Sequence, residues 1–431
     1  MSALLDSFAQ QYTALPEPLR AAGGLAESRS KALAAALQDG LPAVRAERWR
    51  YTPLRALAQR SFRAATGASV DAAMLAHIPA PRLVFVNGWC DRSLSDLNGL
   101  AEGVRVESLG RVLHQAHPRD VAWLGRTFAE ADETFARLNA ALAVEGAVIQ
   151  LEENVQQTAP LHLVSIGATE AADAAWHLRH LIELRHGAAL TVVEHQLAAD
   201  AHAHFDNTLC HVHLKPGAVL RHVRQQTASE HATLLYRTDA VLAAGAEYRR
   251  VDLELGAALS RHELNASLQG EAAAVVSGGA MLADAKRVLD TRLQLDHVAR
   301  DTRCDLRWRG LASARGKLSF YGGIHIRPGA DGTDAQLSNR NLLLSDTAEV
   351  NTQPVLVIDA DEVKAAHGAT VGQLDAQALF YLQSRGIPHD EARAMLMQAF
   401  LIEVLEVLED TGIAESLIPV LQSQLARKPS A

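Results

Sequence analysis

A glycine–alanine pair recurs through the middle of the chain and limits the architectures open to it. The pair stands at Gly187, Gly217 and Gly245, with spacings of 30 (217−187) and 28 (245−217) residues, and again at 146–147 and 256–257. Glycine turns a tight corner without steric strain, so each pair marks a place where one strand ends and the next begins. Repeats of this kind with no helical period between them predict stacked coils of strand, which is a solenoid.

The runs near these corners have the period-two alternation of strands. Residues 148–151, 191–193 and 251–255 are short and rich in valine, isoleucine and leucine, as strands usually are. An antiparallel sandwich also has short strands joined by glycine turns, so the alternation alone leaves both architectures open.

Helical periodicity flanks this strand-rich middle. Apolar residues recur about every 3.6 positions within 1–40 and 119–143, and again after 361 in a stripe that includes Met395 and Phe400. These changes of period predict three parts. They are an N-terminal helical and mixed domain 1–145, a strand core 146–365 and a C-terminal helical domain 366–431.

Composition excludes several classes of protein. The 431 residues carry a net charge of −9 and are 48% hydrophobic, which fits a large soluble core and disfavours a nucleic-acid groove. No stretch approaches the roughly 18 apolar residues of a membrane span, and no basic region precedes an apolar run at the N-terminus. Cys90, Cys210 and Cys304 give an odd count without a C-x-x-C pair. We therefore expect a cytoplasmic protein without a disulfide framework, a membrane segment or a bound nucleic acid.

The most specific motif lies near the C-terminus, from Asp361 to Ile387. It holds a single histidine, His367, in the run H-G-A-T-V-G, and it continues as F-Y-L-Q-S-R-G-I. Asp375 is a suitable N-cap for a short helix, and Gly386 is a suitable residue to end it. His367 is therefore expected where an extended segment passes into a helical one. Imidazole suits iron and zinc, although a lone histidine at such a place is more often a turn residue.

This motif resembles the signature of the SufB/SufD family of iron–sulfur cluster assembly scaffolds, D-D-V-K-C-S-H-G-A-T-V-G followed by F-Y-L-x-S-R-G-I. The resemblance covers nearly the whole chain. It includes G-L-P and E-x-W-R-Y-T within 40–52, L-V-F-V-N-G at 83–88, F-x-x-L-N at 135–139 and N-x-N-L-L-L-S at 339–345. The strand 341–345 lacks a cysteine, which is similar to the SufD branch rather than the SufB branch. One departure is chemically important, because Ala365 stands where the signature has a cysteine.

The resemblance implies a mainly β fold, with a right-handed parallel β-helix-like core flanked by N-terminal and C-terminal helical domains. It implies a non-catalytic scaffold subunit of the SUF complex, which builds and transfers nascent iron–sulfur clusters. The implied partners are a SufB-like paralogue and a SufC-like ABC ATPase, the latter bound through the C-terminal helices, and a homodimer is a further possibility. No tightly bound cofactor is implied. His367 is implied as a ligand of a transient iron–sulfur cluster at the partner interface.

An alternative function rests on the density of histidines. His211 and His213 fall on one face of a predicted strand, a spacing that supports a metal ion once a third ligand approaches. A metal-dependent hydrolase or lyase on a β-helix is therefore the alternative hypothesis. The residues that it would use are His195, His202, His204, His211, His213 and His222.

Carboxylates offer a further version of the enzyme hypothesis. Glu263, Asp290 and the pair Asp296–His297 could serve as acid–base groups, although polar ladders on the outside of a solenoid explain the same pattern. No Walker A motif occurs in the chain. ATP hydrolysis is therefore expected in a separate partner.

Overall fold

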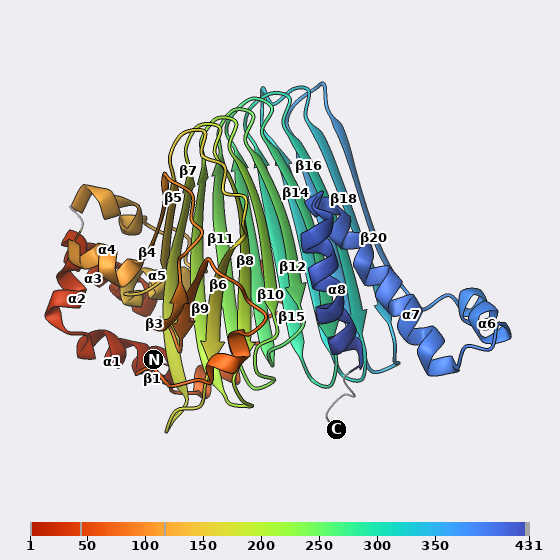
Figure 1. Ribbon diagram of the computed structural model, residues 1–431, viewed down its shortest axis with the longest axis horizontal. Helices are drawn as coiled ribbons and strands as arrows, with labels where there is room; N and C mark the ends of the chain where they lie inside the picture. The colour runs from red at the N-terminus through yellow and green to blue at the C-terminus, as the bar shows by residue number, and fades with distance from the viewer. Residues whose placement is uncertain (1, 44, 116–117, 427–431) are drawn as a thin grey trace.

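The computed structural model describes residues 2–43, 45–115 and 118–426. Its centre is a β-solenoid in which successive strands alternate between two ten-stranded sheets (Figure 1). The predicted mainly β fold, with a solenoid core and helices at both ends, is confirmed. None of the described helices is long and apolar enough to cross a membrane.

The two sheets are named A and B. Sheet A consists of β1(Arg63–Ala64), β4(Val104–Ser108), β5(Ala147–Leu151), β7(Ala174–Leu184), β9(His204–Leu214), β11(Thr233–Leu242), β13(Leu259–Leu268), β15(Val288–His297), β17(Lys317–Ile326) and β19(Glu349–Ile358). Sheet B consists of β2(Arg82–Val86), β3(Trp89–Asp96), β6(Leu161–Gly167), β8(Ala189–Ala198), β10(Val219–Gln226), β12(Glu247–Glu254), β14(Ala274–Ala283), β16(Arg303–Ala312), β18(Asp334–Leu343) and β20(Lys364–Gly372).

Strands of neighbouring coils pair in parallel and without a shift of register from β10 to β20. Alternate side chains of a strand point to the same side of the sheet, so unshifted pairing stacks the inward-facing residues into columns. In sheet B one such column holds Leu306, Leu337 and His367, and the column beside it holds Cys304, Ala335 and Ala365. Leu306 and Leu337 are buried in the solenoid interior, which we call the lumen.

The corners confirm the turns that the glycine–alanine pairs predicted. Gly187, Gly217 and Gly245 have φ values of 63°, 67° and 61°, in the left-handed region. In later coils Ala285 and Ala314 occupy the left-handed region instead, at 51° and 50°. These alanines adopt the left-handed region despite the strain that a side chain causes there. The solenoid therefore continues with the same corners where the glycine repeat is no longer visible in the sequence.

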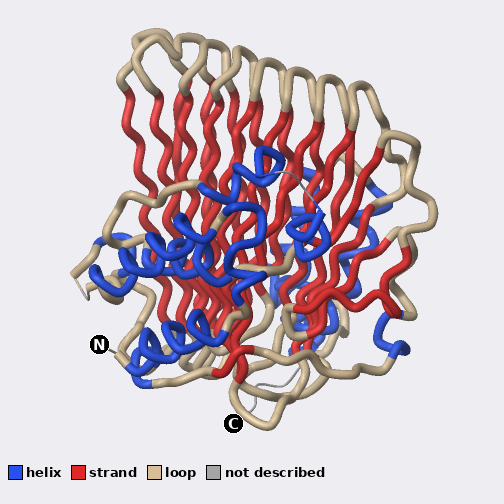
Figure 2. The backbone as a smooth tube through the Cα atoms, turned by 90° about the vertical axis from the view of Figure 1, so that its left-hand side faces the viewer, coloured by secondary structure: helices blue, strands red, loops and turns tan. Residues whose placement is uncertain are grey.

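Helices of the N-terminal region cover the outer face of sheet A, in front of the strands in Figure 2. Phe8 and Phe135 pack there against Phe205 of β9. The Arg29 guanidinium donates to the carbonyls of Ala141 and Ala143 at 2.9 and 2.7 Å. The elements of this region are α1(Ala3–Ala14), α2(Glu17–Ala21), η1(Ala22–Gly24), α3(Ala26–Asp39), η2(Glu47–Trp49), η3(Leu57–Gln59), η4(Ala72–Leu75), α4(Leu109–Gln115), η5(Pro118–Gly125) and α5(Thr134–Leu142).

The C-terminal helices divide into a packed group and a projecting one. Leu408 and Leu417, from the packed group, lie against Val251 and Leu253 on the outer face of sheet B. Helix α6 instead stands away from the sheets, at the right of Figure 1. Asp375 caps it as predicted, by accepting from the Gln377 amide at 2.8 Å. The elements are α6(Ala376–Ser384), α7(His389–Ile402), η6(Glu403–Leu408) and α8(Thr411–Ala426).

The last strand crosses the boundary that the change of period placed between residues 365 and 366. Strand β20 runs from Lys364 to Gly372, and helix α6 begins only at Ala376. His367 consequently lies inside a strand, and the expectation that it sits at a passage from strand to helix is wrong. The helical period begins later than the motif because H-G-A-T-V-G pairs residue for residue with β18.

Candidate functional site

The C-terminal end of the solenoid is uncovered. Among the described strands, β19 pairs only with β17 and β20 only with β18, so each has one free edge. Val371 and Ile358 of this end coil are both 43% exposed, whereas the coils beneath it have buried interiors. An apolar end face with two free strand edges is a surface suited to pairing with further strands.

His367 is the imidazole that the end coil presents on its lumen side. It continues the column of Leu306 and Leu337, which fixes the face of β20 that carries it, and it is exposed because no further coil covers it. The opposite strand contributes no metal-ligating group to the lumen side. Its residues there, by register with buried positions of β17, are Val350, Thr352, Pro354, Leu356 and Ile358.

Ala365, which stands where the signature has a cysteine, lies two residues before His367 in the same strand. Ala365 packs on the apolar core above Ala335 and Cys304. Cys304 cannot replace the missing thiol, because it is fully buried two coils deeper. Burial also raises the pKa of its thiol to about 12. The end coil therefore offers one imidazole and no thiolate.

A second cluster of polar groups lies in the middle of the lumen. Asp252 accepts hydrogen bonds from Arg224 at 3.0 Å and from two nitrogens of Arg250 at 2.7 and 2.8 Å, and all three residues are fully buried. Burial acts to raise the pKa of Asp252, but Arg250 and the other cations outweigh it and hold the pKa well below its usual value. Glu194 in turn lies 3.0 Å from His222 Nε2 and accepts a hydrogen bond from the Tyr236 hydroxyl at 2.6 Å.

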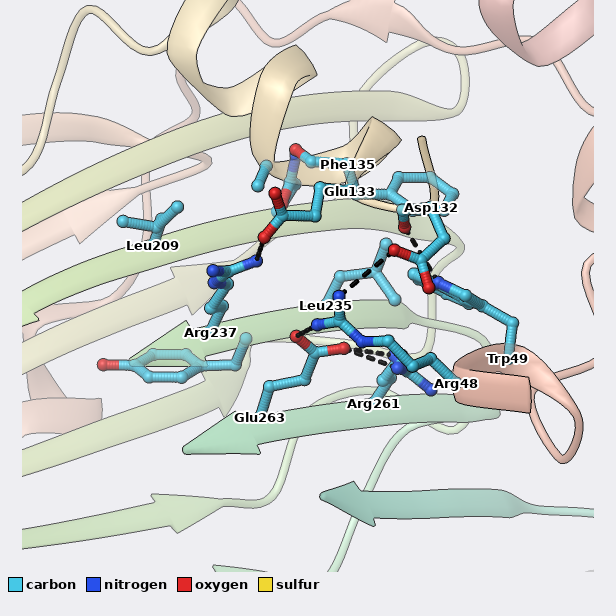
Figure 3. Close-up of a pocket in the computed structure, with 13 residues that line it drawn as sticks. Arg48, Trp49, Asp132, Glu133, Phe135, Leu209, Leu235, Arg237, Arg261 and Glu263 are labelled. Carbon is cyan, nitrogen blue, oxygen red and sulfur yellow. Dashed lines mark hydrogen bonds and ion pairs between the residues drawn. The ribbon is translucent and has the colours of Figure 1, made fainter. Parts of the chain in front are cut away.

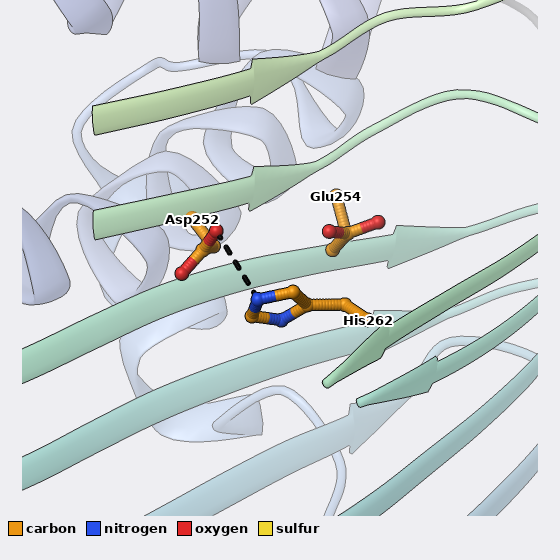
Figure 4. Close-up of side chains that lie close together, drawn as sticks. All are labelled: Asp252, Glu254 and His262. Atoms are coloured by element: carbon orange, nitrogen blue, oxygen red, sulfur yellow. Dashed lines mark ion pairs between the residues drawn. The ribbon is translucent and has the colours of Figure 1, made fainter. Parts of the chain in front are cut away.

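Three potential metal ligands converge in this cluster (Figure 4). Oxygen or nitrogen atoms of Asp252, Glu254 and His262 lie within 4.8 Å of one another. The counter-charges are already in place, however, since Arg224 contacts both carboxylates and Arg250 contacts Asp252. The group is therefore a buried ion-pair network, with guanidinium groups where a metal ion would need to sit.

The histidines of 195–222 do not form the predicted metal site. His195 pairs with His162 at 2.9 Å, and His211 accepts from Arg179 at 3.2 Å. His222 lies beside Glu194, and His202 stacks on His204. In the described part of the chain, none of these six residues belongs to a group of three convergent ligands. Burial moreover lowers the pKa of His195 and of His204 to about 3, so both rings are uncharged at neutral pH.

Glu263 and Asp290 belong to a salt-bridge network that fastens the N-terminal region to sheet A. Arg261 pairs with both carboxylates, at 2.5 and 2.6 Å, and its guanidinium lies 3.8 Å from the centre of the Trp49 ring. Thr52 contacts Asp290. Arg261, Glu263 and Trp49 of this network line a cavity of about 30 Å³, room for about one water molecule (Figure 3).

This network is not arranged as an acid–base pair. Burial acts to raise the pKa of Glu263, but Arg261, Arg237 and Arg48 together lower it to about 2. Asp296 and His297 point to opposite faces of β15: Asp296 pairs with Arg327 at 2.6 Å, and His297 contacts Thr302 and Cys304. Neither candidate has the mutual geometry that proton transfer requires.

Sequence reasoning missed the ion-pair network of the lumen. The alternation Arg250-x-Asp252-x-Glu254 was visible, but it predicts only that the three side chains share a face. The similar alternation Arg261-x-Glu263 lies on the outer face of its sheet, beneath the N-terminal region. The alternation thus shows that the charged side chains of a strand share one face, but it does not show whether that face points into the lumen.

Two family models together match most of the chain. Residues 2–163 match the SufBD protein N-terminal region, and residues 166–400 match the SufBD core domain of the SUF system for FeS cluster assembly. The iron–sulfur cluster assembly protein SufD of Escherichia coli is 31% identical over 396 residues, which cover 90% of each chain. A SufBD family protein of Synechocystis is 30% identical over 381 residues, 85% of this chain and 83% of the relative. SufD of Bacillus subtilis is 38% identical over 108 residues, a quarter of each chain.

Proposed function

The chain belongs to the SufBD family and is a subunit of the SUF system for iron–sulfur cluster assembly, and we propose that it works there as a non-catalytic scaffold. The observation that carries this proposal is the uncovered end coil, an apolar face with two free strand edges and one exposed imidazole. The carboxylates of the other candidates are already paired with arginines: Glu263 and Asp290 with Arg261, Asp296 with Arg327, and Asp252 and Glu254 with Arg224.

The proposed partner at the end coil is a SufB-like paralogue. A related solenoid could add its own terminal strands to the free edges of β19 and β20 and so continue both sheets. The apolar residues of the end face, including Ile358 and Val371, would be buried by that contact. Pairing of two copies of this chain through the same face is the homodimeric version of this arrangement.

The proposed partner of the C-terminal helices is a SufC-like ABC ATPase. The chain has no Walker A motif of its own. Helix α6 exposes Phe380 and Tyr381 at 71% and 57%, and α7 exposes Met395. Large apolar side chains that project on a helix clear of the sheets fit a protein contact better than a cap on the solenoid, because η6 and α8 already cover sheet B.

His367 is proposed as this chain's ligand to a nascent iron–sulfur cluster, which is cargo and not a resident cofactor. Thiolates are the usual cluster ligands, but Cys210 and Cys304 are buried, and burial raises the pKa of both thiols. Cys90 lies near the opposite end of the solenoid, in β3. The thiolates would therefore come from the SufB-like partner. We further propose a cytoplasmic location, as the cysteine pattern predicts.

The test is cluster reconstitution in the assembled complex. The chain is co-expressed with its SufB-like and SufC-like partners, and the purified complex is supplied with ferrous iron and sulfide. We expect His367→Ala to lower the visible absorbance of the cluster without changing the subunit composition of the complex. His231→Ala, at an exposed histidine on the turn between β10 and β11, is the matched control and should keep the full yield. Equal cluster yield from wild type and His367→Ala would contradict the ligand role.

A further inference from the structure

A short polar ladder crosses the lumen between the end coil and the coil beneath it. It consists of Asn339 and Asn341 of β18 and Thr352 of β19, and the two asparagines are buried, at 0% and 1% exposure. The surrounding lumen is apolar, with Leu337, Phe320 and Trp308 as neighbours in the core cluster. Polar groups in such a place stay only if they bond to one another or to the backbone.

The hydrogen bonds of the ladder join strands of both sheets. The Thr352 hydroxyl donates to Asn339 Oδ1 at 2.8 Å, which links β19 to β18 across the lumen. Asn341 Nδ2 donates to the same Asn339 oxygen at 2.6 Å and to the Thr370 carbonyl of β20 at 3.3 Å. The ladder therefore connects both strands of the end coil to the coil beneath.

The absence of a side chain at Gly310 leaves space for the Asn341 carboxamide of the ladder. A Cβ atom on Gly310 would lie 2.3 Å from Asn341 Oδ1, so a larger residue at 310 would push the carboxamide away. Asn341 Oδ1 itself has no hydrogen-bond partner, so the donor side of the amide, through Asn339 and Thr370, determines where the group lies. Leaving a buried polar atom unpaired is unfavourable, and this suggests that the ladder serves something besides packing.

We propose that Asn339, Asn341 and Thr352 are positioning residues that hold the strand of His367 in place before a partner covers it. Thr370 lies three residues after His367 on β20, roughly 10 Å away by strand rise. With one edge of each end strand free, this side-chain link supplements the backbone pairing with β17 and β18. The inference rests on the role proposed for His367, but its first consequence can be measured without a cluster.

That consequence is the rate of amide hydrogen exchange in β20 of the isolated full-length chain. Thr352→Val keeps the shape of the side chain but removes the donor to Asn339, whose oxygen also holds the Asn341 amide that donates to the Thr370 carbonyl of β20. With that support lost, β20 amides should exchange roughly 3- to 10-fold faster, the range for one hydrogen bond. Strands β8 to β14 should be unaffected. Thr352→Ser keeps the hydroxyl and should restore the wild-type rates. Unchanged exchange of β20 in Thr352→Val would overturn the proposal.

Two further measurements separate positioning from general stability. Gly310→Ala, which displaces Asn341 without touching β19 or β20 backbone bonds, should also speed exchange in β20 and should broaden the ring resonances of His367 but not of His389. In the reconstituted complex, Thr352→Val should lower cluster yield and Thr352→Ser should restore it. Loss of yield in His367→Ala but full yield in Thr352→Val would overturn the inference and leave the proposed function standing. Faster exchange in Thr352→Val with full yield in His367→Ala would support the ladder and contradict the ligand role.

Discussion

Asp252 illustrates how a single residue neutralises buried charges inside an otherwise aliphatic solenoid. Its carboxylate lies between Arg224 and Arg250, and none of the three is exposed to solvent. Such a network contributes little net stability compared with apolar packing, but removal of one member leaves the others buried and unpaired. The end of the same lumen shows the opposite case, where His367 is exposed only because the coils stop.

The residue-scale prediction concerns that network. Asp252→Asn should lower the free energy of unfolding by about 3 to 5 kcal/mol, because two buried guanidinium groups lose their shared counter-charge. Glu349→Gln, which removes the exposed pair with Lys317, should leave the unfolding midpoint nearly unchanged, since solvent screens that pair. Urea unfolding followed by circular dichroism measures both. Equal midpoints for wild type and Asp252→Asn would mean that the network does not hold the lumen together.

The strand corners and the projecting helix are the elements on which architecture and partner choice depend. Gly217 and Gly245 have left-handed backbones with no heavy atom closer than 4.0 Å to an added Cβ, so backbone strain alone decides what fits there. Helix α6, by contrast, carries its large apolar side chains outward. The first feature concerns folding and the second concerns recognition.

Valine at either corner should destabilise the solenoid. Gly217→Val and Gly245→Val place a β-branched residue at φ values of 67° and 61°, and each should cost more than about 1 kcal/mol. Gly125→Val is the matched control, because Gly125 has open space around it and no left-handed φ. Thermal unfolding measures the effect. Melting temperatures equal to wild type in both corner variants would refute the assignment of strain.

Substitution on helix α6 should separate partner binding from folding. Phe380→Asp should abolish co-purification with a SufC-like ATPase while the melting temperature stays unchanged, because the side chain is mostly exposed in the isolated chain. Val298→Asp, an exposed apolar residue on a distant turn, is the control and should bind normally. Retained ATPase binding by Phe380→Asp would place the contact elsewhere.

At the scale of the whole molecule, the sequence predicted the solenoid and its helical flanks but not its interior. Gly187, Gly217 and Gly245 revealed the corners because only glycine adopts them freely, whereas Ala285 and Ala314 conceal later corners that have the same shape. Arg250-x-Asp252 and Arg261-x-Glu263 have one pattern and opposite faces, so alternation could not assign the lumen. The exposure of His367 depends on where the stack of coils ends, which no local pattern encodes.

Stability of the whole chain should fall on mild acidification. Burial lowers the pKa of five histidines to about 3 or 4, below the unfolded value near 6.5. The unfolded state therefore binds more protons below pH 6.5, and stability is lost as pH falls toward 4. Glu145 and Asp206, whose pKa values burial raises to about 7 and 6, oppose this trend but are fewer. The histidines concerned are His162, His177, His195, His204 and His297.

The loss between pH 6.5 and 5 should be on the order of 5 kcal/mol. Carboxylates with lowered pKa values, such as Glu194 and Glu263 at about 2, cause a further loss of stability, but only below about pH 4.5. Urea midpoints measured at half-unit steps of pH test this window. A flat profile from pH 7 to 5 would show that the buried histidines do not control acid stability.

The central claim is that this chain is a scaffold subunit whose open solenoid end receives a paralogous partner. Native mass spectrometry of the chain co-expressed with SufB-like and SufC-like proteins tests it most directly. We predict one particle that contains all three chains, and we predict that Val371→Asp on the end face releases the SufB-like chain while the ATPase stays bound. Recovery of the wild-type chain free of the SufB-like protein, or an intact three-chain particle with Val371→Asp, would contradict the account.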